Sequence, residues 1–120
     1  MSYDFYKVMH FLGLIMVFTA LGGQFVHAIN GGDSKQHSGR RWIGMFHGIG
    51  LTIALVAGFG LVAKLGVGFP GWVIVKILIW VALGGIGAFA ARKKSLAGTL
   101  WVVTIALGLL ASYAARTKSF

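Results

Sequence analysis

Long apolar runs broken by short polar segments are the main pattern along this chain. Four runs are long enough for membrane-spanning helices, each of which needs about 20 mostly apolar residues. The predicted helices cover Phe5–Ala28, Trp42–Leu65, Gly71–Ala91 and Gly98–Ala115. A polar loop, a glycine-rich turn ending in the only proline, and a basic link separate them, at residues 30–41, 66–70 and 92–95. The pattern predicts an all-α polytopic membrane protein, a single domain over residues 1–120 built as a four-transmembrane-helix bundle.

The first apolar run has two interpretations, a signal peptide or a retained helix. It carries His10, Gln24 and His27, and it lacks a convincing small-x-small cleavage site. It is also longer than the apolar region of a typical signal peptide. We therefore interpret it as a retained helix.

Basic residues at the helix ends predict the orientation of the bundle. Six of them flank the first and third connections: Lys35, Arg40, Arg41, Arg92, Lys93 and Lys94. Four lie near the helix ends on the opposite side: Lys7, Lys64, Arg116 and Lys118. Because the side richer in Lys and Arg faces the cytoplasm, we expect both termini on the outer side of a bacterial inner membrane. Four aromatic residues fit an interfacial belt: Tyr3, Tyr6, Trp42 and Trp72.

Composition narrows the possible chemistry. Of the 120 residues, 58% are hydrophobic and 11% charged, against about 45–50% and about 25% in soluble domains; a water-soluble enzyme is excluded. The net charge of +9 does not indicate nucleic acid, since the basic residues separate the apolar runs. The chain has no Cys or Glu, and its only carboxylate side chains are Asp4 and Asp33. Disulfides, thiolate metal sites and paired-carboxylate hydrolysis are therefore excluded.

Ionisable residues inside a spanning segment are costly and mark candidate sites. His10, His47 and Lys76 are in this class, with His27 near a helix end. Counting about 1.5 Å of rise per residue places His10, Lys76 and Tyr113 at one level near the outer face. The same count places His47 and His27 toward the inner side.

Small and polar residues share one face of each of the first two predicted helices. In the first helix this face contains His10, Gly13, Val17, Ala20, Gln24 and His27. In the second it contains His47, Gly50, Ala54 and Gly58, with Gly44 and Gly48 alongside. Such faces turn inward for one of two reasons. They permit close helix packing, or they leave room for a flat macrocycle with a His as its axial ligand.

Three strings resemble the SirB-type family of small membrane proteins. They are YKVMHFLGL, GRRWIGMFHGIGLTIALVAGFGL and GWVIVKILIWVALGGIGAFAAR. The family pattern of a His in the first helix, a His opening the second and Trp-x-x-x-Lys opening the third matches His10, His47, Trp72 and Lys76. This arrangement is also similar to HemJ-like and CopD-like bundles. The HemJ-like resemblance implies haem binding or porphyrin oxidation, and the CopD-like resemblance implies copper. The chain departs from the SirB pattern at residues 48–51, where an Asp is expected, and it lacks the Met- and His-rich loops of copper traffic.

Three hypotheses follow. In the first, the protein binds haem b for electron transfer or porphyrin oxidation, with His10 and His47 as candidate iron ligands and Lys76 and His27 as further cofactor-binding residues. His10 and His47 fall in opposite halves of the bilayer, so we do not expect them to share one iron. The alternative is a non-catalytic accessory or assembly subunit that packs through its glycine faces in a homo-oligomer or a larger membrane complex. The third is a proton or small-solute path whose lining residues are His10, Lys76, Tyr113, Thr19 and Thr104.

Overall fold

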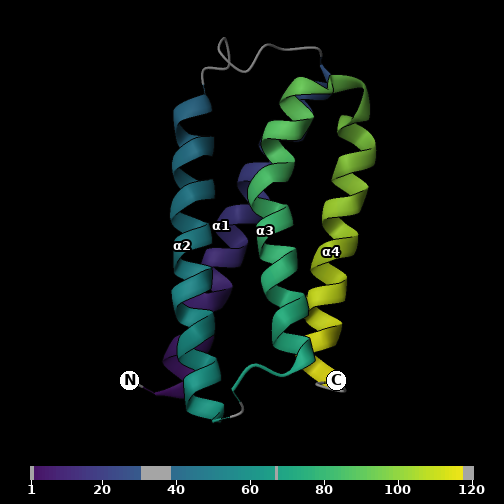
Figure 1. Ribbon diagram of the computed structural model, residues 1–120. Coiled ribbons are helices and arrows are strands. Elements are labelled where there is room, and N and C mark those ends of the chain that lie inside the picture. Colours follow the sequence, from purple (N-terminus) through teal and green to yellow (C-terminus); the bar gives the residue numbers. More distant parts are fainter. Residues whose placement is uncertain (1, 31–38, 67, 118–120) are drawn as a thin grey trace.

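The computed structural model describes residues 2–30, 39–66 and 68–117, and they form four long helices joined by short connections (Figure 1). The helices are α1 (Tyr3–Ile29), α2 (Arg40–Leu65), α3 (Gly71–Arg92) and α4 (Ala97–Thr117), with a short 3₁₀ helix, η2 (Lys94–Leu96), before α4. Each of the four predicted helices is confirmed, with every end within two residues of its predicted position. The polar loop over 31–38, with Lys35, and Lys118 lie outside the described residues.

Local sequence explains where the helices begin and end. The Ser2 hydroxyl caps α1 by accepting a hydrogen bond from the backbone N–H of Phe5 at 3.1 Å. At the end of α2, Gly66 takes φ +68°, the left-handed conformation that glycine adopts without strain. Pro70 then stands immediately before α3, where its missing N–H costs no helix hydrogen bond. The chain therefore reverses direction between α2 and α3 in a tight turn.

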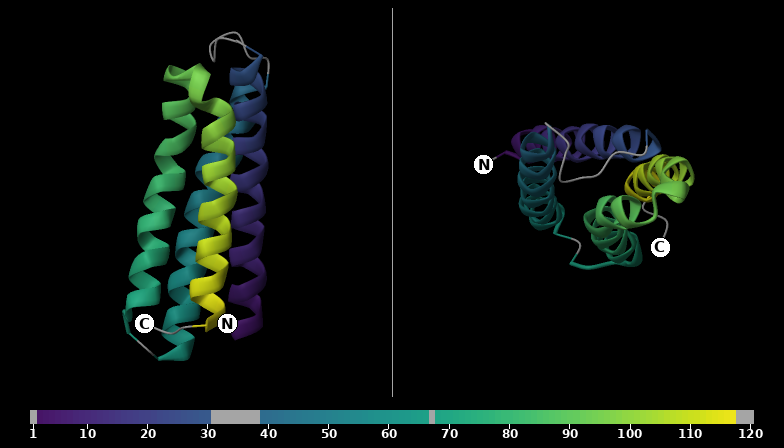
Figure 2. Two further views of the ribbon diagram at one scale, coloured as in Figure 1. Left: turned by 90° about the vertical axis from the view of Figure 1, so that its right-hand side faces the viewer. Right: turned by 90° about the horizontal axis from the view of Figure 1, so that it is seen from above.

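The four helices run up and down, so both termini lie at the same end of the bundle (Figure 1). All four are long and apolar enough to span a bilayer. Helix α1 packs against each of the other three, whereas α2 packs closely on α1 and only sparsely on α3. Figure 2 shows the same arrangement from above, with α1 beside α2 and α4. The seam between α2 and α3 is therefore the least tightly packed one between neighbouring helices.

Glycines bring the backbones of α1 and α2 together. A Cβ added at Gly13 would lie 2.6 Å from the Ala54 nitrogen and 2.7 Å from the Gly50 oxygen. Conversely, a Cβ added at Gly50 would lie 2.8 Å from the Gly13 oxygen. The predicted inward faces are confirmed here, because Gly13, Gly50 and Ala54 are all buried. Close packing is thus the reason for the small residues at this crossing.

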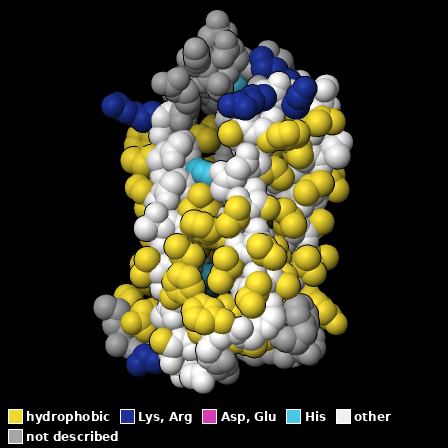
Figure 3. Space-filling view, viewed as in Figure 1, with side chains coloured by type: hydrophobic (Ala, Val, Ile, Leu, Met, Phe, Trp, Pro, Cys, Tyr) yellow, Lys and Arg dark blue, Asp and Glu magenta, His cyan; other side chains and the backbone are white. Residues whose placement is uncertain are grey.

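The hydrophobic core fills the half of the bundle away from the termini. Its buried residues come from α1 and α3: Val17, Leu21, Phe25, Ile79, Leu83, Ile86 and Ala90. Side chains of α4, including Trp101, pack against them. Outside this core the helices expose many large apolar side chains, which form the yellow surface between the dark blue basic residues at the two ends (Figure 3).

The predicted aromatic belt is wrong at one position. Trp72 is only 7% exposed and packs with Val73 and Ala114, because the first turn of α3 lies against the end of α4. Tyr6 is half-buried, with its ring over Gly60. Tyr3 and Trp42 are exposed, as a belt position requires.

Candidate functional site

A cavity of about 540 Å³ lies between the four helices, in the half of the bundle that contains the termini. This volume falls in the range of about 300–1,000 Å³ that is typical of small-molecule sites. Most of the lining is aliphatic or aromatic. Its polar side chains come from α1, α3 and α4: Tyr3, Lys7, His10, Lys76, Ser112 and Arg116. An apolar chamber with a few convergent polar groups is the usual composition of a ligand site.

His10 presents a nitrogen atom that is available for a ligand. Its Nδ1 lies 2.8 Å from the carbonyl oxygen of Ala54. Because a carbonyl oxygen only accepts, Nδ1 carries the proton and donates it. The second nitrogen, Nε2, is buried and has no hydrogen-bond partner. In the neutral ring Nε2 therefore offers a lone pair, and a backbone carbonyl that fixes the opposite nitrogen is the usual support of a metal-ligating histidine.

Small residues of α2 put the His10 ring in this position. The crossing at Gly13 and Gly50 brings the Ala54 carbonyl within reach of α1. One turn further along α2, a Cβ added at Gly58 would lie 3.2 Å from Cε1 of the His10 ring. The glycine thus leaves room for the imidazole, while the crossing supplies its hydrogen-bond acceptor.

Three cationic side chains line the same cavity. Lys7 and Arg116 come from the terminal ends of α1 and α4, and Lys76 comes from the second turn of α3. Lys76 lies close enough to the His10 ring to interact with it electrostatically. The described residues of the lining include no carboxylate. The cavity is therefore positively charged, as well as apolar.

His47 lies outside this cavity, on the seam between α2 and α3. Its Nε2 donates to the carbonyl oxygen of Leu83 at 3.0 Å. Trp80 spans the seam in the opposite direction, with Nε1 donating to the carbonyl oxygen of Leu51 at 2.9 Å. Histidine side chains, in cyan, are visible in this seam in Figure 3. Two side-chain hydrogen bonds thus join helices that otherwise contact each other sparsely.

Trp80→Phe is expected to loosen the seam and lower the free energy of unfolding. The phenyl ring keeps most of the apolar contact but cannot donate to Leu51, and a hydrogen bond between membrane helices contributes on average about 0.6 kcal/mol. With the smaller ring we expect a loss of about 1–2 kcal/mol in denaturant titrations of the detergent-solubilised protein. Trp101→Phe is the control, because it makes the same change at an indole that packs against the Phe25 ring, with 6.2 Å between the ring centroids. A loss no larger than that of the control would contradict the role of this bond.

Of the three residues predicted at one level, two line the same cavity and the third does not. His10 and Lys76 do line one cavity. Tyr113, which shares their level, is 59% exposed and points away from it. Counting residues gives the depth of a side chain along its helix but not its direction around the helix axis. His27 is half-buried in the last turn of α1, outside the cavity lining.

The residues named in the third hypothesis do not all line one cavity. Thr19 donates to the backbone oxygen of Ile15, on its own helix, and is exposed. Thr104 is buried but donates to Leu100, also on its own helix. Neither residue lines the cavity, so of the residues predicted for the path only His10 and Lys76 meet there.

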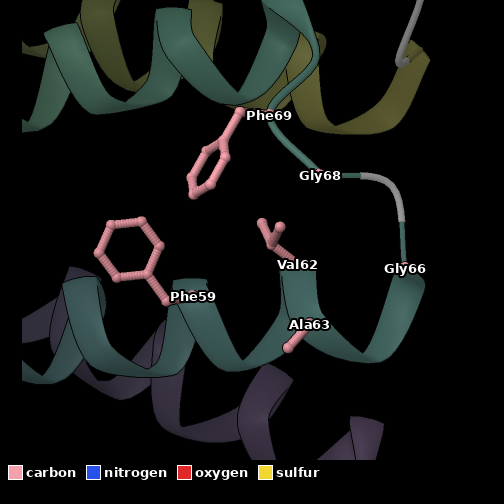
Figure 4. A pocket seen from close by; sticks show the side chains of 6 residues that line it. All are labelled: Phe59, Val62, Ala63, Gly66, Gly68 and Phe69. Atoms are coloured by element: carbon pink, nitrogen blue, oxygen red, sulfur yellow. The ribbon is translucent and has the colours of Figure 1, made fainter.

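A second hollow of about 500 Å³ lies at the turn between α2 and α3 and is open and apolar (Figure 4). Its lining includes Phe59 and Phe69, whose rings meet edge to face at 6.2 Å. It contains no polar side chain, so it offers no chemistry.

Sequence reasoning missed the cavity roles of Lys7, Ser112 and Arg116. We interpreted Lys7 and Arg116 as orientation signals only. Helical spacing contains the missing signal, since Lys7 lies three residues before His10, and Ser112 four residues before Arg116. Among the described residues no group of three His or Asp side chains forms a metal site. Of the described histidines only His10 lines the cavity, so it is the one among them that would ligate an iron held here.

Comparisons with known protein families, curated proteins and solved structures find no match to this chain. The resemblance to SirB-type proteins at His10, His47, Trp72 and Lys76 therefore stays a prediction. The function has to be inferred from the cavity itself.

Proposed function

We propose that the protein is an integral membrane protein of the SirB-like type that binds haem or a related porphyrin in the cavity beside His10. The observation that carries the proposal is the His10 side chain, which lines a cavity of about 540 Å³ and whose buried Nε2 has no hydrogen-bond partner. Imidazole nitrogen is a standard axial ligand of haem iron. The donor, the apolar lining and the volume all fit such a group.

The surface of the bundle supports a membrane location. Side chains such as Val8, Leu78 and Leu109 are 65%, 64% and 72% exposed, and they are spread over different helices. Soluble monomers rarely expose contiguous apolar surface on this scale. We place both termini on the outer side of a bacterial inner membrane, following the excess of basic residues on the opposite side.

The residues of the cavity have separable tasks in this proposal. A bound haem would supply one-electron chemistry. The Ala54 carbonyl holds the proton of His10 on Nδ1, so Nε2 is the nitrogen that would bind an iron. The apolar lining excludes water, and a dry surrounding strengthens the electrostatic effect of Lys76. Among the described residues of the lining, His10 is the one that would hold the iron of such a group.

The absorption spectrum of the purified protein tests the proposal. On titration with haemin in detergent we expect a saturable Soret band near a 1:1 ratio, which shifts on reduction. The matched control is the same detergent without protein. A spectrum that stays identical to that of haemin in empty micelles would refute haem binding.

A specific observation favours the alternative, an accessory or assembly subunit. Gly44 and Gly48 lie one turn apart on α2, and a Cβ added to either would meet no atom within 4 Å. Both glycines are exposed, unlike Gly50 on the opposite side of the same helix. A G-x-x-x-G pair on an open helix face is the usual contact surface of a second membrane helix.

A further inference from the structure

Two of the three cationic side chains of the cavity lie at one end of the bundle. Lys7 lies near the beginning of α1 and Arg116 near the end of α4, and both of these helix ends are at the terminal end of the bundle (Figure 1). Tyr3 lines the same part, with its ring 6.0 Å from the Lys7 ammonium. Deeper in, the lining is apolar apart from His10, Lys76 and Ser112. The cavity thus has a cationic mouth and an apolar interior.

Such a distribution selects for a ligand of matching polarity. Guanidinium and ammonium groups bind carboxylates through short, charge-assisted hydrogen bonds. Near the low dielectric of a bilayer these interactions are stronger than in water. The described lining offers these cations no carboxylate of its own, and Asp4, the carboxylate on the first turn of α1, lies outside it.

We propose that the cavity selects apolar molecules that carry a carboxylate, and that Lys7 and Arg116 hold the carboxylate at the mouth while the apolar body lies between the helices toward His10. This inference deepens the proposed function. It rests on that proposal only for the placement of a porphyrin macrocycle beside His10. Its chemistry is shared by porphyrin carboxylic acids and by long-chain fatty acids.

Lys64 provides a matched control. It is exposed in the last turn of α2, at the same end of the bundle, and does not line the cavity. If Lys7 and Arg116 serve only as cations at the lipid headgroups, Lys64→Gln will have the same effect on ligand binding as Lys7→Gln or Arg116→Gln. If Lys7 and Arg116 bind a carboxylate, Lys7→Gln and Arg116→Gln will weaken ligand binding and Lys64→Gln will not.

The test compares metal-free protoporphyrin IX with its dimethyl ester, which has the same macrocycle but no charge. Binding to the protein in zwitterionic nanodiscs is followed by quenching of tryptophan fluorescence, since Trp72 and Trp80 both line the cavity. We expect the diacid to bind at least about tenfold tighter than the ester, the difference expected for hydrogen bonds to a charged group. The K7Q/R116Q double variant is expected to lose that preference while K64Q keeps it. Thermal unfolding followed by circular dichroism verifies that each variant is folded.

A second pair of probes, oleate and methyl oleate, separates this inference from the haem proposal. Equal binding of the porphyrin diacid and ester would overturn the carboxylate site and leave haem binding intact. No porphyrin binding, with oleate bound tightly only when Lys7 and Arg116 are present, would support the carboxylate site and refute binding through the macrocycle alone; the haemin titration then decides the haem proposal separately. Binding of neither pair of probes, or equal losses in K64Q and K7Q/R116Q, would overturn the inference.

Discussion

Replacing His10 with alanine is expected to abolish the Soret band of the haem-loaded protein and to lower haem affinity by more than about 100-fold. The substitution removes the only described histidine side chain that lines the cavity, since the Nε2 of His47 is bonded to Leu83 on the seam. It should leave the fold intact, because the Ala54 carbonyl keeps its hydrogen bond within α2 when the imidazole is lost. The measurement is a haemin titration followed at the Soret maximum, with helical content measured by circular dichroism.

His47→Ala is the matched control, and its expected phenotype is the reverse. It should retain the Soret band, and it should lower the unfolding free energy by about 1 kcal/mol through loss of the bond between α2 and α3. Added imidazole should restore the band in His10→Gly, since the free ligand can occupy the space left by the side chain. An unchanged spectrum in His10→Ala, together with loss of the band in His47→Ala, would place the iron on the seam instead.

The helices and the depth of the polar residues could be predicted from the sequence for a physical reason. A hydrophobic run of about 20 residues in this composition has few alternatives to a spanning helix. The bilayer interior offers no hydrogen-bond partners, so the chain must pair its own backbone groups, and a helix does this. Depth then follows from residue count, and that is why His10 and Lys76 were expected at one level and do line one cavity.

The rotation of each helix about its own axis could not be predicted as well. Gly44, Gly48 and Gly50 look alike in a sequence, yet only Gly50 packs against α1. Trp72 and Trp42 both stand near predicted helix ends, yet one is buried and the other exposed. The hydrophobic contrast between opposite faces is weak when lipid surrounds a helix, so the sequence carries little signal for the direction of a side chain.

The hydrogen-bond partners of the two histidines could not be predicted from the sequence either. Each bonds a backbone carbonyl of another helix, Ala54 for His10 and Leu83 for His47. Backbone carbonyls are present at every residue, so no side-chain pattern marks the ones that are used. The difference between a ring that offers a lone pair to a cavity and one that closes a seam arises only from the packing.

Gly13→Ala is expected to cause the largest loss of stability of any single-methyl addition to this chain. The new Cβ would lie 2.6 Å from the Ala54 nitrogen, a backbone atom that moves only if α1 and α2 separate. Overpacking of this kind costs about 1–3 kcal/mol and sometimes more, and here separation would also lengthen the bond between His10 and Ala54. We expect a loss of at least about 3 kcal/mol in denaturant titrations, with weaker haem binding as a secondary effect.

Gly44→Ala adds the same methyl group to a helix face where it meets no atom within 4 Å. It should be neutral, or stabilising by a few tenths of a kcal/mol up to about 1, because alanine favours the helix over glycine. Equal losses in the two variants would show that α1 and α2 do not cross closely at Gly13. Gly48→Leu extends the comparison to the assembly hypothesis, since its side chain begins where an added Cβ meets no atom within 4 Å and would block a second helix on that open face. If wild-type protein cross-links into oligomers and Gly48→Leu does not, while both bind haem equally, the two proposed functions occupy separate faces of α2.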